Sequence, residues 1–178
     1  SLASGDSHSC GRTNAGAAYC WGDDEFAQLG SGVPPTDVLS PRAVSGGITF
    51  ASLTAGFNHT CGLTSAGAAY CWGSNFRGAM GDGTTTNRIT PVPVTGGLSF
   101  RSIGSGGDFT CGVTTADEIW CWGNNSVGQI GDGTITNRLA PWRITPGGTA
   151  AQLTFLVDPS TTAAGATVPA RPESRTMV

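Results

Sequence analysis

Hydrophobic and polar residues alternate in short runs along this chain, most clearly between residues 49 and 94. Residues 49–55 alternate apolar with small polar positions, as a half-buried strand does. Residues 59–64 and 68–72 form two further runs, joined by a turn at Gly67. A last run at residues 90–94 contains proline, which belongs at the edge of a sheet. The pattern therefore predicts four short strands and no helix in this stretch.

The same stretch occurs three times, and each copy carries two motifs. The first is Gly-Asp-Ser-His-Ser-Cys-Gly at residues 5–11, with counterparts at residues 56–62 and 106–112. The second is Cys-Trp-Gly, at residues 20–22, 71–73 and 121–123. Copies spaced about 50 residues apart indicate one supersecondary unit repeated in a solenoid, propeller or array. Four short strands per copy favour a propeller in which each copy is one blade.

The six cysteines form one C-x9-C pair per copy: Cys10 with Cys20, Cys61 with Cys71, and Cys111 with Cys121. Zinc ribbons use closer pairs, such as C-x2-C. A hairpin that turns near Ala66 places Cys61 opposite Cys71, within bridging distance. Each bridge would stabilise the fold by about 2.5–3 kcal/mol on the chain-entropy model. We therefore predict three cross-strand disulfides and an oxidising compartment, with reduced, buried cysteines as the alternative.

The motifs G-x-x-H-[ST]-C, Y-C-W-G and G-D-G-T-T-T-N-R resemble the regulator of chromosome condensation repeat. The resemblance is closest to the cysteine-bearing versions of bacterial surface and secreted proteins, and it covers residues 1 to about 150. It implies three propeller blades, at about residues 1–50, 51–100 and 101–150. Complete members of the family close seven blades into a ring. The family's nucleotide exchange on a small GTPase is not carried over, because no residue here matches that interaction.

The chain departs from the repeat pattern in two ways that affect its expected domain organisation. The chain begins inside a blade, so we expect upstream sequence to be missing, and residues 151–178 contain no further copy. We predict a flexible tail at residues 151–178, whose start resembles a bacterial immunoglobulin-like domain. Three blades leave two open edges, a liability that ring closure removes. A cyclic homodimer is the simplest closed assembly; an open monomer and a higher assembly are the alternatives.

Composition excludes several classes of function. A net charge of −3 and a pI near 5.1 give no electrostatic basis for binding nucleic acid or an anionic membrane. All nine basic residues are arginine, which excludes Schiff-base chemistry and a lysine base. No apolar run is long enough to insert into a bilayer. The sequence also lacks a G-x-S-x-G elbow, a P-loop and a dinucleotide fingerprint.

His8 and His59 are the only histidines, and they occupy the same position in the first and second copies. Phe109 takes that position in the third copy, after Asp108. The structural interpretation is that each imidazole, near the central channel, ties its blade to a neighbour through hydrogen bonds. The functional interpretation is a zinc-like site formed by the four imidazoles of a homodimer, with Asp6 and Asp108 as carboxylate ligands or a general base.

Other recurring residues favour structural roles. The loops at residues 82–88 and 132–138 lack the acid ladder of a calcium loop, and we interpret them as Asp-Gly turns with Arg88 and Arg138 paired locally. The acidic triplet at residues 23–25 is predicted to be a solvated loop, with a weak cation site as the alternative. One tryptophan per blade is expected to wedge between neighbouring blades: Trp21, Trp72 and Trp122. Trp142 is the aromatic residue expected to be free for contacts.

These observations predict an all-β propeller fragment of three four-stranded blades, completed by homo-oligomerisation. The function that fits best is a non-catalytic recognition or scaffold module outside the cell or at the bacterial cell surface or periplasm. The alternative is a metal-dependent ester or phosphoester hydrolase, whose site around His8 and His59 is assembled by two chains. Chelator-sensitive turnover would distinguish the hydrolase from the scaffold.

Overall fold

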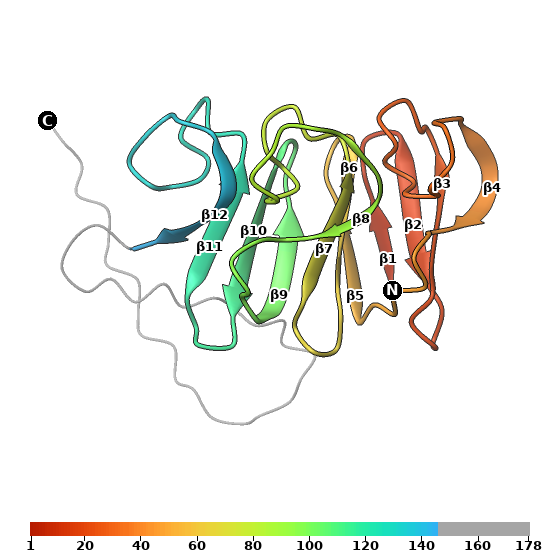
Figure 1. Cartoon of the computed structure of the whole chain (residues 1–178), viewed down its shortest axis with the longest axis horizontal. Helices are drawn as coiled ribbons and strands as arrows, with labels where there is room; N and C mark the ends of the chain where they lie inside the picture. The colour runs from red at the N-terminus through yellow and green to blue at the C-terminus, as the bar shows by residue number, and fades with distance from the viewer. Residues whose placement is uncertain (146–178) are drawn as a thin grey trace, which may run out of the picture. The chain divides into compact units, whose positions relative to one another are not determined.

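A computed structural model describes residues 1–145, which form three four-stranded antiparallel sheets, or blades (Figure 1). The first blade contains β1 (Leu2–Ser4), β2 (His8–Arg12), β3 (Ala18–Gly22) and β4 (Val38–Ala43). The second contains β5 (Ser52–Ala55), β6 (His59–Leu63), β7 (Ala69–Gly73) and β8 (Arg88–Pro93). The third contains β9 (Phe100–Ser105), β10 (Phe109–Thr114), β11 (Ile119–Gly123) and β12 (Arg138–Ile144). The predicted all-β class and four strands per copy are confirmed; the predictions for residues 151–178 lie outside the described residues.

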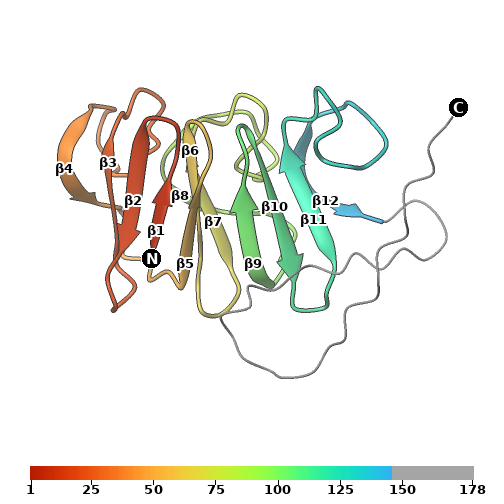
Figure 2. The same cartoon turned by 180° about the vertical axis from the view of Figure 1, so that it is seen from behind.

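The strands of each blade are hydrogen-bonded in chain order, and the blades lie side by side (Figures 1 and 2). The first strands of the three blades, β1, β5 and β9, contact one another in sequence. The fourth strands form the outer edges, and each contains a proline: Pro41, Pro91 and Pro141. Proline cannot donate to a further strand, so the prediction that the Pro-bearing strands are edges is confirmed. Residues 1–145 contain no helix long and apolar enough to span a bilayer.

Each blade connects its strands differently at its two ends. At one end, the top of Figure 1, lie the turn between the first and second strands and the long loop between the third and fourth. We call this end the long-loop face; it includes residues 23–37, 74–87 and 124–137. At the opposite end lie the tight turns between the second and third strands, and we call it the hairpin face. These turns lie at residues 13–17, 64–68 and 115–118.

The cysteines of each blade pair across its central two strands. In all three blades the two partners lie directly opposite each other: Cys10 and Cys20, Cys61 and Cys71, Cys111 and Cys121. All three pairs are disulfides with Cα atoms 4.1 Å apart, and the described residues contain no free cysteine. The predicted cross-strand disulfides are therefore present, and the alternative of reduced cysteines is wrong. Disulfides of this kind are typical of proteins from oxidising compartments.

Burial differs between the middle blade and the outer two. Every residue of β6 is buried, because the second blade is covered on both sides by its neighbours. The equivalent strands β2 and β10 each leave several residues only half-buried. The first and third blades therefore each expose one packing surface within residues 1–145.

Candidate functional site

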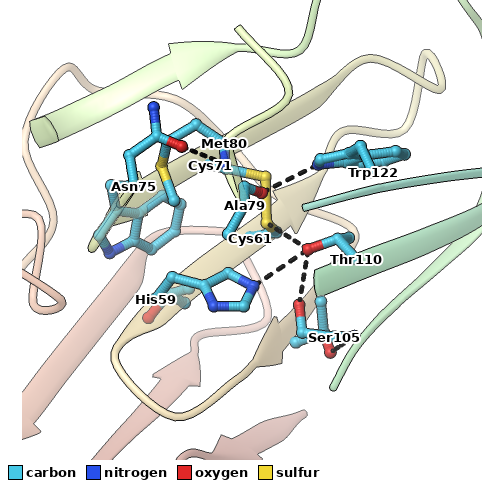
Figure 3. Close-up of a disulfide and its surroundings, with 12 residues drawn as sticks. His59, Cys61, Cys71, Asn75, Ala79, Met80, Ser105, Thr110 and Trp122 are labelled. Atoms are coloured by element: carbon cyan, nitrogen blue, oxygen red, sulfur yellow. Dashed lines mark hydrogen bonds between the residues drawn. A yellow bond between two sulfur atoms is a disulfide. The ribbon is translucent and has the colours of Figure 1, made fainter. Parts of the chain in front are cut away.

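Two tryptophans wedge between blades and define the interblade contact. Trp72 and Trp122 are fully buried, and each belongs to the hydrophobic core of the preceding blade. The indole N–H of Trp72 donates to the carbonyl of Gln28 at 3.0 Å. That of Trp122 donates to the carbonyl of Ala79 at 2.9 Å (Figure 3). Each junction is thus fixed by one apolar ring and one directed hydrogen bond.

Glycine makes room for each ring. A Cβ atom at Gly30 would lie 2.6 Å from the Trp72 ring, and one at Gly81 would lie 2.8 Å from the Trp122 ring. Both glycines also have φ near +65°, a conformation that other residues rarely adopt. No larger side chain fits these positions, so the glycines belong to the interblade contact. The sequence period pointed to the tryptophans but gave no indication of these partners.

Trp21 occupies the same position in the first blade but has no preceding blade to enter within residues 1–145. It is only partly buried and lies over Gly11 of its own sheet, with 3.8 Å between the ring and a Cβ built at Gly11. Gly131 is the counterpart of Gly30 and Gly81 in the third blade. It is exposed, and a Cβ atom built there meets only Ile144, at 3.9 Å.

The histidines tie successive blades together. His8 Nε2 and Thr60 Oγ1 are hydrogen-bonded at 2.8 Å. His59 Nε2 and Thr110 Oγ1 are hydrogen-bonded at 3.0 Å (Figure 3). The Thr60 hydroxyl itself donates to the Gln28 carbonyl at 2.9 Å, so His8 Nε2 is the donor in its bond to Thr60. The hydrogen bonds expected on structural grounds are therefore present. The rings sit at the start of β2 and β6, the second strands, not on the first strands that contact one another.

Both imidazoles are buried and neutral at physiological pH. Loss of solvation lowers the pKa of His8 to about 4, although the Asp23 carboxylate acts in the opposite direction. The pKa of His59 is lowered to about 4, mainly by loss of solvation and to a lesser extent by the nearby His8 ring. The backbone carbonyl of Gly107 acts in the opposite direction but is outweighed. The buried Nδ1 atom of each ring has no hydrogen-bond partner among the described residues. These properties suit a structural tie that stays uncharged in the core.

The structure does not bring the candidate metal ligands together within one chain. Among residues 1–145, no group of three or more His, Cys, Asp or Glu side chains is arranged to hold a metal ion. Asp6 is exposed, and Asp108 lies 3.8 Å from Arg77 across the boundary between the second and third blades. A site shared between two chains stays a prediction.

The Asp-Gly loops of the second and third blades are closed by arginine, so the predicted local pairing is confirmed. Arg88 Nε donates to Asp82 Oδ2 at 2.8 Å, and Arg138 Nε donates to Asp132 Oδ2 at 2.7 Å. Burial alone would raise the pKa of each carboxyl. Hydrogen bonds from threonine, arginine and asparagine outweigh it, and the pKa of Asp132 falls to about 2. Both aspartates are therefore charged, and each holds its loop closed through its arginine.

A buried asparagine anchors each of these loops. Asn75 accepts from the backbone N–H of Met80 at 3.0 Å, while its Nδ2 donates to Asp82 at 3.1 Å and to the carbonyl of Thr84 at 3.1 Å. Asn125 makes the corresponding bonds in the third blade. The amide thus supplies both an acceptor and a donor that the loop needs.

The first blade has Asp24 at this position, and here the prediction of a solvated acidic loop is wrong. Asp24 is 1% exposed and accepts backbone hydrogen bonds from Leu29 at 3.0 Å and Thr36 at 3.3 Å. Burial raises the pKa of this carboxyl, an effect that the two backbone donors and Arg42 only partly offset. The sequence does contain an indication that Asp24 is buried, because Asn75 and Asn125 occupy the same position in the other two copies.

Exposed apolar side chains are distributed unequally between the two ends of the blades. Five of them lie in loops and turns of the long-loop face: Val33, Phe57, Phe76, Val127 and Ile135. In the described part of the chain, no large apolar side chain is exposed on the turns of the hairpin face. Large exposed apolar residues that gather on one face mark interaction sites. Trp142, the aromatic residue predicted to be free, is exposed on β12 and lies 3.9 Å from the guanidinium of Arg138.

A pocket of about 240 Å³ opens among the loops of the long-loop face. Phe26 and Phe76 form its apolar wall, with their ring centroids 5.7 Å apart in an edge-to-face arrangement. Asn58 and the Arg77–Asp108 ion pair supply its polar groups. Aromatic walls with a few converging polar groups are the usual chemistry of a recognition site. Residues from all three blades therefore contribute to one pocket.

Comparisons with known proteins agree with this geometry. Two models described as the regulator of chromosome condensation (RCC1) repeat match the chain, one at residues 1–28, 50–79 and 100–129, the other at residues 15–63 and 66–113. Probable E3 ubiquitin-protein ligase HERC4 of Rattus norvegicus is 35% identical over 82 residues, covering 45% of this chain and 8% of the relative. Ultraviolet-B receptor UVR8 of Arabidopsis thaliana is 36% identical over 90 residues, covering 49% of this chain and 20% of the relative.

Solved structures show the same fold. Prp20p of Saccharomyces cerevisiae superposes with a TM-score of 0.75 at 21% identity, over 84% of this chain and 39% of that one. Human WBSCR16 superposes with a TM-score of 0.73 at 22% identity, over 82% of this chain and 39% of that one. The chain spans a small part of the sequence relatives and about two fifths of these structures. The fold is therefore three consecutive blades of a β-propeller.

Proposed function

Because the chain belongs to the regulator of chromosome condensation (RCC1) repeat family, we propose that it is an extracellular recognition module that binds a protein partner through its long-loop face. The module acts by binding and performs no catalysis. The single observation that carries this proposal is the concentration of exposed apolar side chains on that face. Phe57 and Phe76 are the two aromatic residues among them.

The pocket beside these aromatics supports recognition of a protein surface or segment. Its wall of Phe26 and Phe76 accepts an apolar side chain, while Asn58 and the Arg77–Asp108 pair offer donors and acceptors at its rim. Aromatic and arginine residues dominate the binding energy of protein interfaces. The three disulfides support placing the module outside the cell.

Structures similar to this one also support protein recognition. Prp20p of Saccharomyces cerevisiae has binding properties toward Gsp1p and histones, and yeast RCC1 (Prp20) has been solved bound to Kap60. One propeller with this fold, Prp20p, thus binds proteins. Because disulfides favour an oxidising compartment, we infer that the partner of this chain is an extracellular protein and not one of those partners.

An array of purified extracellular protein domains tests the proposal. We expect the labelled chain to bind a restricted set of these domains. Binding should weaken at least about tenfold in Phe57→Ser and Phe76→Ser, because each substitution removes an exposed apolar contact. The matched control is Ala116→Arg, which changes an exposed position on the hairpin face and should leave binding unchanged. Binding that survives both serine substitutions, or no binding to any domain, would overturn the proposal.

A further inference from the structure

We propose that the hairpin face carries a binding site for a small hydroxylated carboxylate, such as a sugar acid, and that Arg12 pairs with its carboxylate group. The site is a pocket of about 320 Å³ between the first and second blades, called the Arg12 pocket below. It lies where the turns after β2 and β6 approach the segment that enters β5 (Figure 1). This end of the blades is opposite to the long-loop face, so the inference does not depend on the proposed function.

Arg12 departs from the repeat at a position that is otherwise apolar. It is the last residue of β2, and its counterparts are Leu63 in β6 and Val113 in β10. Leu63 is 5% exposed and belongs to the hydrophobic core that joins the second and third blades. The first blade therefore places a guanidinium group where the second blade places a core leucine.

The side chain of Arg12 faces the second blade. Successive side chains of a strand point to opposite sides, so Arg12 shares its side of β2 with His8 and Cys10. Both of these residues contact Thr60 of the second blade, through His8 Nε2 at 2.8 Å and Cys10 Sγ at 3.8 Å. The Arg12 pocket therefore lies at an internal junction, and both of its walls belong to the described residues.

The charge of Arg12 has no protein partner within residues 1–145. No carboxylate of this part of the chain lies within ion-pair distance of its guanidinium group. Nη1 donates to the carbonyl of Thr13 at 3.1 Å, but the buried Nε has no hydrogen-bond acceptor. By contrast, Arg101 of the third blade pairs with Asp117 at 2.8 Å. Because a partly buried charge without a partner is unfavourable, an anion in the pocket would stabilise this arginine.

The planar guanidinium group favours a carboxylate as the charged part of the ligand. Arginine and carboxylate groups match in geometry, and their hydrogen bonds are stronger than those between neutral groups. No acidic residue lines the Arg12 pocket, so no negative charge of its wall opposes an anion. The pocket therefore discriminates by charge between an acid and a neutral molecule of the same size.

The other polar side chains of the pocket suit hydroxyl groups. Asn14, Thr49 and Ser65 line it, and their amide and hydroxyl groups both donate and accept hydrogen bonds. Two backbone segments, at Gly16 and Ala51, complete the wall without bulky side chains. A volume of about 320 Å³ lies at the lower end of the range for small-molecule sites and has room for one sugar ring. A sugar acid satisfies both the arginine and these polar groups.

An NMR titration of the isotope-labelled full chain with D-glucuronate and with D-galacturonate tests this inference. We expect saturable shifts of the backbone amides of Asn14, Gly16 and Ala51, with a Kd on the order of 1 mM for at least one acid. D-Glucose lacks the charge and inorganic sulfate lacks the hydroxyl groups, so each should bind at least about tenfold more weakly. If neither acid binds saturably, or if glucose or sulfate binds equally well, the inference is overturned.

Substitution of Arg12 assigns the binding to this residue. Arg12→Leu introduces the residue that the second blade has at this position, so the blade should remain folded, and binding of the acid should weaken at least about tenfold. Arg12→Gln removes the charge but keeps a polar side chain, and it replaces the leucine variant if that chain unfolds. The matched control is Arg101→Leu, which removes an arginine already paired with Asp117 and should leave binding unchanged. Binding that survives loss of Arg12, or that falls equally in Arg101→Leu, would refute the assignment.

Discussion

His59 Nε2 and Thr110 Oγ1 lie 3.0 Å apart although 51 residues separate them in the chain. The bond joins the second blade to the third, and His8 makes the equivalent bond between the first and second. Both rings are buried, so protonation would place a charge in the interface between blades. The histidines therefore make the stability of the blade stack depend on pH.

Stability should fall as the pH drops from 6.5 toward 4. The unfolded chain protonates each histidine near pH 6.5, whereas the folded chain resists protonation until about pH 4. The unfolded state thus binds more protons in this window, and each ring should lower the free energy of unfolding by on the order of 3 kcal/mol across it. Urea denaturation at pH 7 and pH 4.5 measures the change.

Glutamine provides the control for this prediction. His8→Gln and His59→Gln keep an amide N–H near the threonine hydroxyl but remove the titration. The double variant should lose the fall in stability above pH 4 and keep only the opposite effect of Asp24, whose pKa is raised. The Asp82 and Asp132 carboxyls, whose pKa values are lowered, act only at more acidic pH. An unchanged slope in the double variant would assign the effect to other groups.

The histidine site also makes a prediction about metals. If the rings are structural ties, dialysis against EDTA should leave the midpoint of thermal unfolding and the mass of the assembly unchanged. A midpoint that falls with EDTA, recovers with zinc and becomes insensitive in the double glutamine variant would instead support a metal site shared between two chains. Native mass spectrometry before and after dialysis reads bound metal directly.

Reciprocal substitutions should reveal the difference between Asp24 and Asn75. Asn75→Asp would place a carboxylate about 3.1 Å from the Asp82 carboxylate and remove a donor to Thr84, so we expect a loss of roughly 2–4 kcal/mol. Asp24→Asn removes a buried carboxylate whose pKa is raised, but its amide NH2 cannot accept from the backbone N–H of Leu29 or Thr36, so we expect a smaller loss of about 1 kcal/mol at pH 7. Chemical denaturation of the two variants measures both changes. Equal effects of the two substitutions would contradict this account.

The middle disulfide should contribute more stability than the third. Replacing either pair by alanine opens a loop of the same length, because both pairs have a sequence separation of 10. The chain-entropy loss is therefore about 3 kcal/mol in each case. Cys61 and Cys71 are fully enclosed between blades, whereas Cys111 is only half-buried beside its buried partner Cys121. The Cys61→Ala/Cys71→Ala variant should lose about 1–2 kcal/mol more by urea denaturation, because its cavity cannot collapse.

The sequence alone was enough for features that form within one blade. The spacing of the cysteines led to the disulfides, and the prolines marked the edge strands, because both depend on neighbouring strands of one hairpin or sheet. Asp82 and Arg88 were paired correctly for the same reason. These predictions concern residues a few positions apart, where strand geometry limits the possibilities.

The partners of the residues that join neighbouring blades were harder to anticipate. Trp72 donates to the backbone carbonyl of Gln28. Every residue has such a carbonyl, so the sequence does not indicate which one accepts the bond. Asp24 was misjudged even though its hydrogen bonds lie within one loop of the first blade. Acidic residues are usually solvated, and only the equivalence of Asp24 with Asn75 indicates burial. The pocket on the long-loop face was also not predicted, since its residues come from four separate loops and turns.

Each disulfide closes within a single hairpin, so no disulfide joins one blade to another within the three described blades. A blade can thus complete its oxidative folding as soon as its own cysteines have entered the oxidising compartment, without waiting for distant segments. Mispairing is also limited, because the correct partner is always the closest cysteine in the chain. Duplication or deletion of a whole repeat leaves every remaining pair complete, which gives this architecture a simple route to evolve proteins with different numbers of blades.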